Sequence, residues 1–389
     1  MKKPICLFAS YLVRFPLGGH VLSQLNLIDG FLQLGYDVVF VEHYGWPQSC
    51  YHPHARRWTD DPAYGIKEIE RYFHRLGLKR WCYIDAAGRY HGLGRSELRR
   101  ACVDSALLFS VGSTTWVDEF RECRSRVYFD IDPGFTQFRM SEKPTLSCAG
   151  YGYGSPYEFD VHFTIGERIG QPDCRIPTHG LHWRPTRNPV SLNIVHPRIT
   201  PDAQRFTTVM NWTSYGDITH EGVRYGQKDV ELMKLVDLPQ RTGPILELAL
   251  VGENLPGDEL RNAGWHINDA LQVTLTVESY LDFIGRSRGE FSVAKEAYVK
   301  TRCGWFSDRT AAYLASGKPA IVQDTGFSSS LPCGEGLFAF SHADDVARAV
   351  EAINSDYVRQ CRAARQIAKD YFDAKKILAK MLQETAAGQ

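Results

Sequence analysis

A strand, a glycine loop, a helix and a second strand follow one another at the start of this chain. Residues Ile5 to Ala9 form a short apolar run, and Gly18-Gly19 marks a tight loop. Apolar residues then recur at helical spacing from Gly19 to Leu34 and stop at Gly35. Because Asp37 to Glu42 encloses the apolar run Val38–Val41 and is expected to be a second buried strand, this order predicts a βαβ unit, which requires a parallel sheet covered by helices.

The strand and helix signals continue along the chain and restart after a proline-rich stretch. Between Ile176 and Arg205 lie five prolines with little periodicity, so we interpret this stretch as a semi-rigid connector without regular structure. Residues 44–64 are rich in Trp, Tyr, His and Pro and are expected to form a long surface loop that serves a site. Further elements are expected as strands at 106–111, 126–131, 161–165, 206–210, 245–251, 289–293 and 319–323, and as helices at 277–285, 308–316, 344–353 and 356–382, with a break near Asp373.

The length of 389 residues exceeds what one compact core usually holds, so the restart indicates a second domain. We predict an α/β protein of two doubly wound Rossmann-like domains that face a cleft. The expected divisions are a first domain at 1–190, a linker at 191–200, a second domain at 201–355 and C-terminal helices at 356–389.

Charge and cysteine usage limit the partners and the compartment. The chain holds 45 Lys plus Arg and 45 Asp plus Glu, so no bulk charge attracts it to nucleic acid or to an anionic membrane. No apolar run reaches the ~18 residues of a membrane helix. The ten cysteines stand singly, without a C-x-x-C pair, which favours a cytoplasmic protein with reduced thiols and no structural metal.

The segment from Glu290 to Gly326 holds the most specific pattern. Ser307 and Asp308 are good N-cap residues, and the helix that they open would present free N–H groups and a positive dipole end to a diphosphate. Arg309 adds a guanidinium in the first turn. Asp324-Thr325-Gly326 comes just past a strand, where ligands of open α/β sheets bind. A routine helix cap and a routine turn remain the alternative interpretation.

The same segment resembles the donor-binding part of GT-B glycosyltransferases, the two-Rossmann-domain enzymes that use nucleotide sugars. It is similar to a bacterial branch with the strings Glu-Phe-Ser-Val-Ala-Lys, Gly-Trp-Phe-Ser-Asp-Arg and Gln-Asp-Thr-Gly-Phe, which stand here at 290–295, 304–309 and 323–327. Related strings stand at 176–187, 206–212 and 225–228, so the resemblance spans most of residues 126–340. It implies that the C-terminal helices cross back onto the first domain.

The resemblance also implies which residues of the second domain hold the donor. It puts the diphosphate at Ser307, Asp308 and Arg309, together with Asn211 and Trp212. It puts Lys295 in the loop that meets the nucleotide base, Lys228 as a further cation, and Asp324, Thr325 and Gly326 near the sugar. A place in the core or at a hinge is an equal alternative for Trp212, and a solvated surface position is the favoured alternative for Lys228.

One departure from the family pattern bears on stereochemistry. Many retaining GT-B enzymes carry two Glu separated by seven residues, and the corresponding positions here are Ala312 and Gly304. Because both carboxylates are absent, either another residue replaces them or the reaction is inverting, and we favour the inverting reaction. GT-B enzymes generally work without a metal, so we expect no metal and no cofactor beyond the nucleotide sugar itself, with UDP or dTDP as its nucleotide.

Three residues of the first half are candidates for the base that activates an acceptor hydroxyl. His20 follows Gly18 and Gly19, which would let a sugar or phosphate approach the backbone, and a histidine can accept a proton near neutral pH. Asp130 and Asp132 end a predicted strand. For this pair we rank acceptor orientation or general-base catalysis first, a plain turn second and a metal site last. For His20 the alternative is a partly exposed bystander at a helix start.

These observations predict a glycosyltransferase that moves a sugar from a nucleotide diphosphate sugar to an acceptor hydroxyl. The acceptor is a small molecule, a glycan or a nucleic-acid base, and the protein acts as a monomer or homodimer. Two alternatives use the same fold: a nucleotide-sugar-binding partner protein that has lost transfer, and a nucleotide-sugar epimerase.

Overall fold

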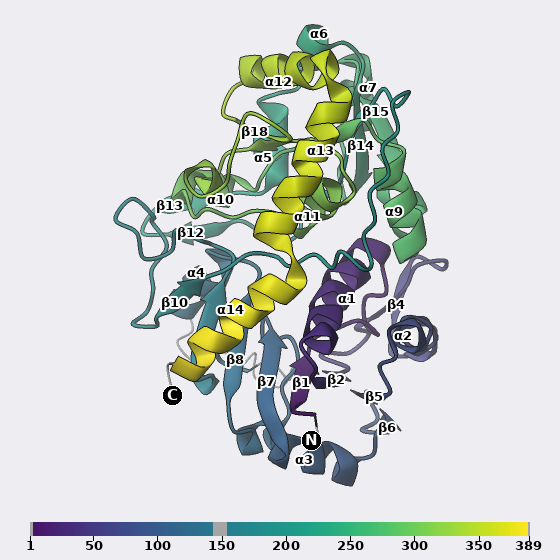
Figure 1. The fold of residues 1–389 in the computed structure, drawn as a ribbon, viewed down its shortest axis with the longest axis vertical. Helices are drawn as coiled ribbons and strands as arrows, with labels where there is room; N and C mark the ends of the chain where they lie inside the picture. Colours follow the sequence, from purple (N-terminus) through teal and green to yellow (C-terminus); the bar gives the residue numbers. More distant parts are fainter. Residues whose placement is uncertain (1–2, 143–153, 388–389) are drawn as a thin grey trace.

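The chain folds around two mainly parallel sheets, which lie in the lower and upper halves of the computed structural model (Figure 1). The structure describes residues 3–142 and 154–387. The first sheet has the order β10-β9-β8-β7-β1-β2-β5-β6, in which only β6 runs antiparallel to its neighbour. The second has the order β15-β14-β11-β16-β17-β18 and is parallel throughout.

The first sheet forms because its strands are short apolar runs that helices bury on both faces. All five residues of β1 are buried, and Phe8 within it stacks on Phe40 and Phe109 of the two neighbouring strands. Its strands are β1 (Ile5–Ala9), β2 (Asp37–His43), β5 (Arg80–Ile84), β6 (Tyr90–Gly92), β7 (Ser105–Val111), β8 (Arg126–Asp130), β9 (Val161–Thr164) and β10 (Trp183–Pro185). Its helices are α1 (Gly18–Gln33), α2 (Ala63–Leu76), α3 (Arg95–Val103) and α4 (Phe135–Glu142).

The second sheet repeats this plan with shorter elements. Its strands are β11 (Phe206–Asn211), β14 (Leu246–Val251), β15 (His266–Asp269), β16 (Gly289–Ser292), β17 (Ala320–Gln323) and β18 (Leu337–Phe340). A hairpin of β12 (Ile218–His220) and β13 (Val223–Tyr225) lies beside it. The helices are α5 (Lys228–Met233), α6 (Pro239–Thr242), α7 (Gly257–Asn262), α8 (Ala270–Thr274), α9 (Val277–Gly285), α10 (Glu296–Thr301), α11 (Asp308–Ala315), α12 (Ala343–Ser355), α13 (Tyr357–Ile367) and α14 (Ala374–Ala387).

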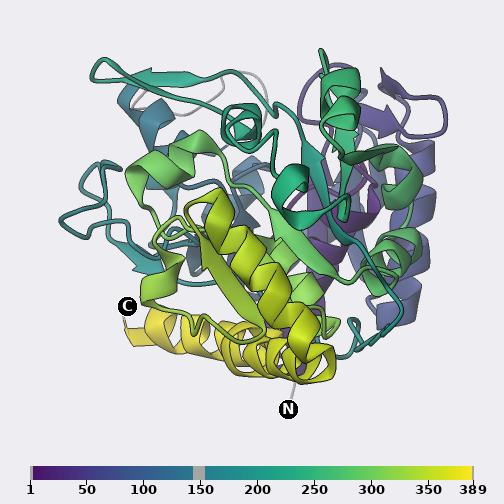
Figure 2. The same cartoon turned by 90° about the horizontal axis from the view of Figure 1, so that it is seen from above.

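The last two helices run from the second sheet back to the first (Figure 1). A π-helical turn at Ala368–Phe372 separates α13 from α14, which confirms the expected break near Asp373. The break is held by two backbone hydrogen bonds, from the Val190 N–H to the Phe372 carbonyl (2.7 Å) and from the Ala374 N–H to the Val190 carbonyl (3.0 Å). Leu378 of α14 then packs over Gly30 of α1. Figure 2 shows both helices along one side of the molecule, near both termini.

Two stretches that were expected to lack regular structure contain strands. The proline-rich stretch includes β10, which extends the first sheet beside β9. Pro185 is tolerated there because β10 is the edge strand of the sheet, where the missing N–H of a proline costs nothing. The loop at 44–64 contains a hairpin of β3 (Cys50–His52) and β4 (Arg57–Thr59).

Within residues 3–142 and 154–387 we find no helix with the length and apolarity that crossing a bilayer requires.

Candidate donor and acceptor cleft

A cavity of about 330 Å³ opens between the two sheets, at the carboxyl ends of their central strands. Ligands of open parallel sheets bind at these ends because the connecting loops there diverge. The first half contributes His20, Ser23 and Gln24 of α1 and Asp132 beyond β8. The second half contributes residues from the loops and helix starts that follow its strands: Asn211, Lys228, Lys295, Tyr298, Trp305 and Asp308.

Lys228 is the cation of this cavity that has no hydrogen-bond partner among the described residues. It is the first residue of α5, and burial lowers its pKa well below the ordinary value, with the positive charges of Arg309 and Lys295 acting in the same direction. The amide of the preceding residue, Gln227, is buried without a partner for either polar atom. Unsatisfied polar groups beside an unpaired cation are costly unless a ligand completes them.

Helix α11 begins at the cavity, but only its first residue faces it. Ser307 is the N-cap, and its Oγ accepts the Arg309 N–H at 3.2 Å. Asp308 lines the cavity. The Arg309 guanidinium points inward, where it donates to Glu290 Oε1 (2.7 Å), to the Val209 carbonyl (2.7 Å) and to Ser292 Oγ. The expectation that Arg309 faces the diphosphate is therefore corrected: its charge compensates the buried Glu290 carboxylate.

Lys295 and Asp132 join the two halves across the cavity. Lys295 Nζ lies 3.0 Å from Asp132 Oδ1, and the same oxygen accepts the Tyr298 hydroxyl. Lys295 Nζ also donates to the Tyr215 hydroxyl and lies over the rings of Phe135 and Tyr215, at 4.4 and 4.1 Å from their centroids. Burial lowers the pKa of Lys295, and the Asp132 carboxylate opposes this effect. Lys295 thus meets the first domain's carboxylate inside the cleft.

His20 presents one nitrogen to the protein and keeps the other without a described partner. Its Nε2 lies 2.5 Å from the Tyr11 carbonyl oxygen, so Nε2 carries the hydrogen and Nδ1 keeps its lone pair. The ring stacks on Tyr11 with centroids 4.2 Å apart. Burial lowers the pKa of His20 to about 4, against the opposing effects of the Tyr11 carbonyl and the Asp308 carboxylate. His20 is therefore neutral at physiological pH.

The loop that carries Tyr11 is anchored by a buried ion pair. Both oxygens of Glu42 accept backbone N–H groups, from Leu12 and Val13 at 2.7 Å and from Arg14 at 2.9 Å. Arg14 Nε closes the pair with Glu42 at 3.1 Å. This cradle fixes the backbone that orients His20.

Asp130 does not reach the cavity as a base. Its side chain is fully buried, and its two oxygens accept hydrogen bonds from the Asp132 N–H, Thr136 Oγ1, Gln137 Nε2 and Thr164 Oγ1 at 2.7–3.1 Å. A carboxylate with four donors has little capacity left for a substrate. We correct the expectation of a catalytic Asp130 to a structural role that shapes the turn before α4.

Gly18 and Gly19 serve the contact between domains instead of a ligand. A Cβ at Gly18 would overlap the Thr276 carbonyl before α9, and one at Gly19 would meet the Tyr280 ring at 3.3 Å. Trp212 is buried in the core of the second half, where it packs against Gly252. The cavity side of that loop is Asn211. The expected donor contacts of these glycines and of Trp212 are thus corrected to packing roles.

The expected sugar-binding turn is also satisfied within itself. Asp324 Oδ1 accepts the Gly326 N–H at 2.8 Å, and Oδ2 accepts Ser328 Oγ at 2.7 Å. Thr325 is buried and donates to the Trp305 carbonyl at 2.6 Å. None of the three residues lines the cavity, because their polar atoms hold the turn together and Arg168 covers Gly326.

Several cavity residues were not singled out from the sequence, among them two polar side chains on helices. Tyr298 and Gln24 lie one helical turn beyond the predicted Lys295 and His20, on the same cavity. Counting four residues onward from His20 along its predicted helix would have found Gln24, whereas no helix was expected at α10 and Tyr298 could not be found in this way.

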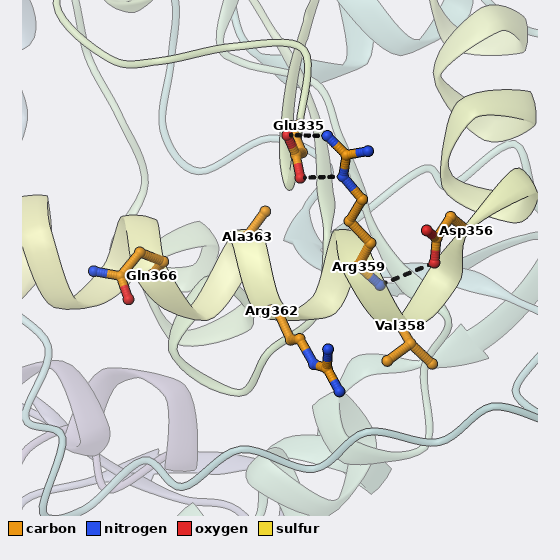
Figure 3. Close-up of a pocket in the computed structure, with 7 residues that line it drawn as sticks. All are labelled: Glu335, Asp356, Val358, Arg359, Arg362, Ala363 and Gln366. Carbon is orange, nitrogen blue, oxygen red and sulfur yellow. Dashed lines mark hydrogen bonds and ion pairs between the residues drawn. The ribbon is translucent and has the colours of Figure 1, made fainter.

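A larger hollow of about 530 Å³ lies along α13, away from the strand ends (Figure 3). Its Arg359 is turned toward Glu335, with Nε 2.8 Å from Oε1, whereas Arg362 points to the other side of the helix. This hollow gathers no catalytic pair. Across the described ranges no group of three or more His, Cys, Asp or Glu side chains is arranged to hold a metal ion.

Comparison with solved structures aligns the chain with glycosyltransferases over nearly its whole length. An α-glucosyltransferase in complex with UDP-glucose and abasic DNA is 11% identical with a TM-score of 0.60, covering 98% of this chain and 99% of that one. Sucrose-phosphate synthase from Thermosynechococcus elongatus is 13% identical, with a TM-score of 0.53 and 99% of each chain covered. AviGT4, a glycosyltransferase of avilamycin A biosynthesis, is 13% identical with a TM-score of 0.53, over 98% of this chain and 97% of that one.

No family model and no curated protein matches the chain. At these identities the likeness establishes the fold. The expected two-domain α/β architecture of GT-B glycosyltransferases is therefore confirmed.

Proposed function

We propose that this protein transfers a sugar from a nucleotide diphosphate sugar, linked to UDP or dTDP, to an acceptor hydroxyl. The observation that carries the proposal is the unpartnered Lys228 in a cavity whose opposite wall holds His20 with Nδ1 available. The fold shared with glycosyltransferases that bind UDP and UDP-glucose supports it. One chain supplies every group of this site, so a monomer suffices.

Lys228 binds the diphosphate and stabilises the negative charge that grows on it as the sugar leaves. Asn211 and the positive end of α11 assist from the same side of the cavity. Because these groups supply the positive charge, the reaction needs no divalent metal. A carboxylate repels phosphate, so Asp308 instead accepts hydrogen bonds from hydroxyls of the sugar.

His20 takes the proton of the acceptor hydroxyl on Nδ1 while the acceptor oxygen bonds to the anomeric carbon. The bond from that carbon to the diphosphate oxygen breaks with its electron pair, which leaves with the nucleotide and inverts the configuration. A pKa of about 4 makes His20 a weak base. It suffices in an oxocarbenium-like transition state, because the attacking hydroxyl becomes strongly acidic as its bond to carbon forms.

Asp132 is the less suitable base because Lys295 already neutralises its charge. We assign this pair to holding the two domains closed around the donor, which excludes water from the activated sugar.

The nine described cysteines are unpaired, as suits a reducing cytoplasm, where nucleotide sugars are made.

Donor hydrolysis tests the proposal without knowledge of the acceptor. The purified protein is incubated with a panel of UDP- and dTDP-sugars, and release of UDP or dTDP is followed with and without EDTA. Slow hydrolysis of one donor, unaffected by EDTA and lost in Lys228→Met, is expected. Thermal shifts that show no stabilisation by UDP or dTDP would refute the proposal.

A further inference from the structure

Aromatic rings continue from the cleft to the surface of the first domain. The Phe15 ring lies 5.9 Å from His20 and stacks on Trp58 with centroids 6.0 Å apart and planes 16° apart. Tyr51 contacts both Phe15 and Trp58, at 5.8 and 5.0 Å. Trp58 is 48% exposed, and the Phe15 and Tyr51 residues that its ring contacts are partly exposed, so the three form one aromatic patch. Phe15, Tyr51 and Trp58 are called the aromatic platform below.

Two of the three platform rings belong to a hairpin that contacts both halves of the chain, and Phe15 precedes α1. Tyr51 stands on β3 and Trp58 on β4, and the connection between the strands carries Arg56. Arg56 forms an ion pair with Asp269, at the end of β15 in the second half of the chain. The hairpin therefore reaches the second half of the chain, and the platform is continuous with the residue that we propose as the base.

The charge around the platform is balanced. Residues 50–61 contain two positive side chains, Arg56 and Arg57, and two negative ones, Asp60 and Asp61. With the histidines neutral, the net charge of this segment is therefore zero. The ion pair with Asp269 further neutralises Arg56. A polyanion such as nucleic acid gains most of its affinity from unpaired cations, and this surface offers it little. The surface suits a neutral ring with one apolar face.

We propose that the aromatic platform binds a neutral sugar unit of the acceptor, so that the acceptor is an oligosaccharide. A pyranose has C–H groups on its face and hydroxyls on its rim, and the C–H groups pack on the electron-rich face of an exposed indole. The terminal sugar places its hydroxyl at His20 in the cleft, and a following sugar stacks on Trp58. This inference rests on the proposed function, since it names the acceptor of that site.

Binding of neutral glycans tests the proposal. A glycan array of neutral oligosaccharides is probed in the presence of UDP, and hits such as gluco- or manno-trisaccharides are measured by calorimetry. We expect Trp58→Ala to weaken oligosaccharide binding by about tenfold, and Trp58→Phe to retain most of it. Tyr157→Ala removes an equally exposed aromatic ring (48%) elsewhere on the first half and should change nothing.

The outcomes separate the two proposals. UDP binding that is unchanged in Trp58→Ala, together with lost oligosaccharide binding, supports the inference. Glycan binding that ignores Trp58, or an array without hits although UDP binds, overturns it and leaves the proposed function standing. Salt-sensitive binding of a thymidine octanucleotide through Trp58 would also overturn it, in favour of a nucleic-acid acceptor. Absence of binding by both UDP and dTDP would instead refute the proposed function.

Discussion

Replacing Lys228 with methionine should strengthen the fold and weaken donor binding in the same variant. The side chain lines the cavity with no hydrogen-bond partner among the described residues, so until a diphosphate arrives only the more distant charges of Asp308 and Glu290 oppose the desolvation of its own charge. Methionine keeps the length of the side chain and removes that cost. We expect the free protein to gain about 1 kcal/mol, or about 2 °C in Tm.

The loss of affinity follows from the hydrogen bonds that the ammonium group makes to phosphate. A hydrogen bond to a charged group contributes ~1.5–3 kcal/mol, so UDP should bind Lys228→Met about 10–100 times more weakly. Isothermal titration calorimetry with UDP measures this loss, and urea unfolding measures the gain in stability. Lys375→Met removes an exposed lysine of α14 and serves as the control.

The pH dependence of stability provides a second readout. The folded-state pKa of Lys228 lies below the ~10.4 of an unfolded lysine, so the unfolded chain binds more protons between the two values. The stability of the wild type therefore rises with pH across this interval, and the advantage of Lys228→Met shrinks. A variant that binds UDP within about twofold of the wild type, or that is less stable at neutral pH, would refute this reasoning.

Three further predictions concern one residue of the site and two residues that support its structure. His20→Gln should abolish transfer while UDP binds as before, and the wild-type rate, measured against pH, should stay level near neutrality and fall only as the pH approaches 4. Arg309→Met should cost about 3–5 kcal/mol in urea unfolding because it leaves the Glu290 carboxylate buried and unpaired, and adding Glu290→Gln should restore part of the loss. Gly18→Ala should force α1 away from Thr276 and expand the molecule in small-angle X-ray scattering, whereas Gly216→Ala, with open space around its Cα, should leave the scattering unchanged.

The fold was accessible from the sequence because local rules determine most of it. Buried parallel strands appear as short apolar runs, and the Gly35 that follows α1 ends it where the helical spacing stops. The β3–β4 hairpin and β10 escaped notice because strands of three residues carry no readable alternation. Their existence depends on neighbours that are remote in the sequence, as Trp183 pairs with His162.

The sequence predicted where the site lies better than it predicted what each residue does there. Of the residues that were expected to hold the donor, Asn211, Lys228 and Lys295 line the cavity. Sequence distance does not show which of two adjacent side chains points inward. Asp308 and Arg309 are neighbours on the first turn of α11, and a rotation of about 100° between them sends one into the cavity and the other to Glu290.

The pairing of Arg309 with Glu290 also explains why a motif string can be specific without touching a ligand. Glu290 lies on a buried strand, and its carboxylate is fully buried, so a cation must reach it from the facing helix. Arg309 does so and at the same time donates to the Val209 carbonyl near the end of β11 and to Ser292. One guanidinium thus fixes β11, β16 and α11 relative to one another, and these are the elements whose ends carry Asn211, Lys295 and Asp308. Substituting Arg309 would therefore damage donor binding by displacing the loops, although the side chain itself contacts no phosphate.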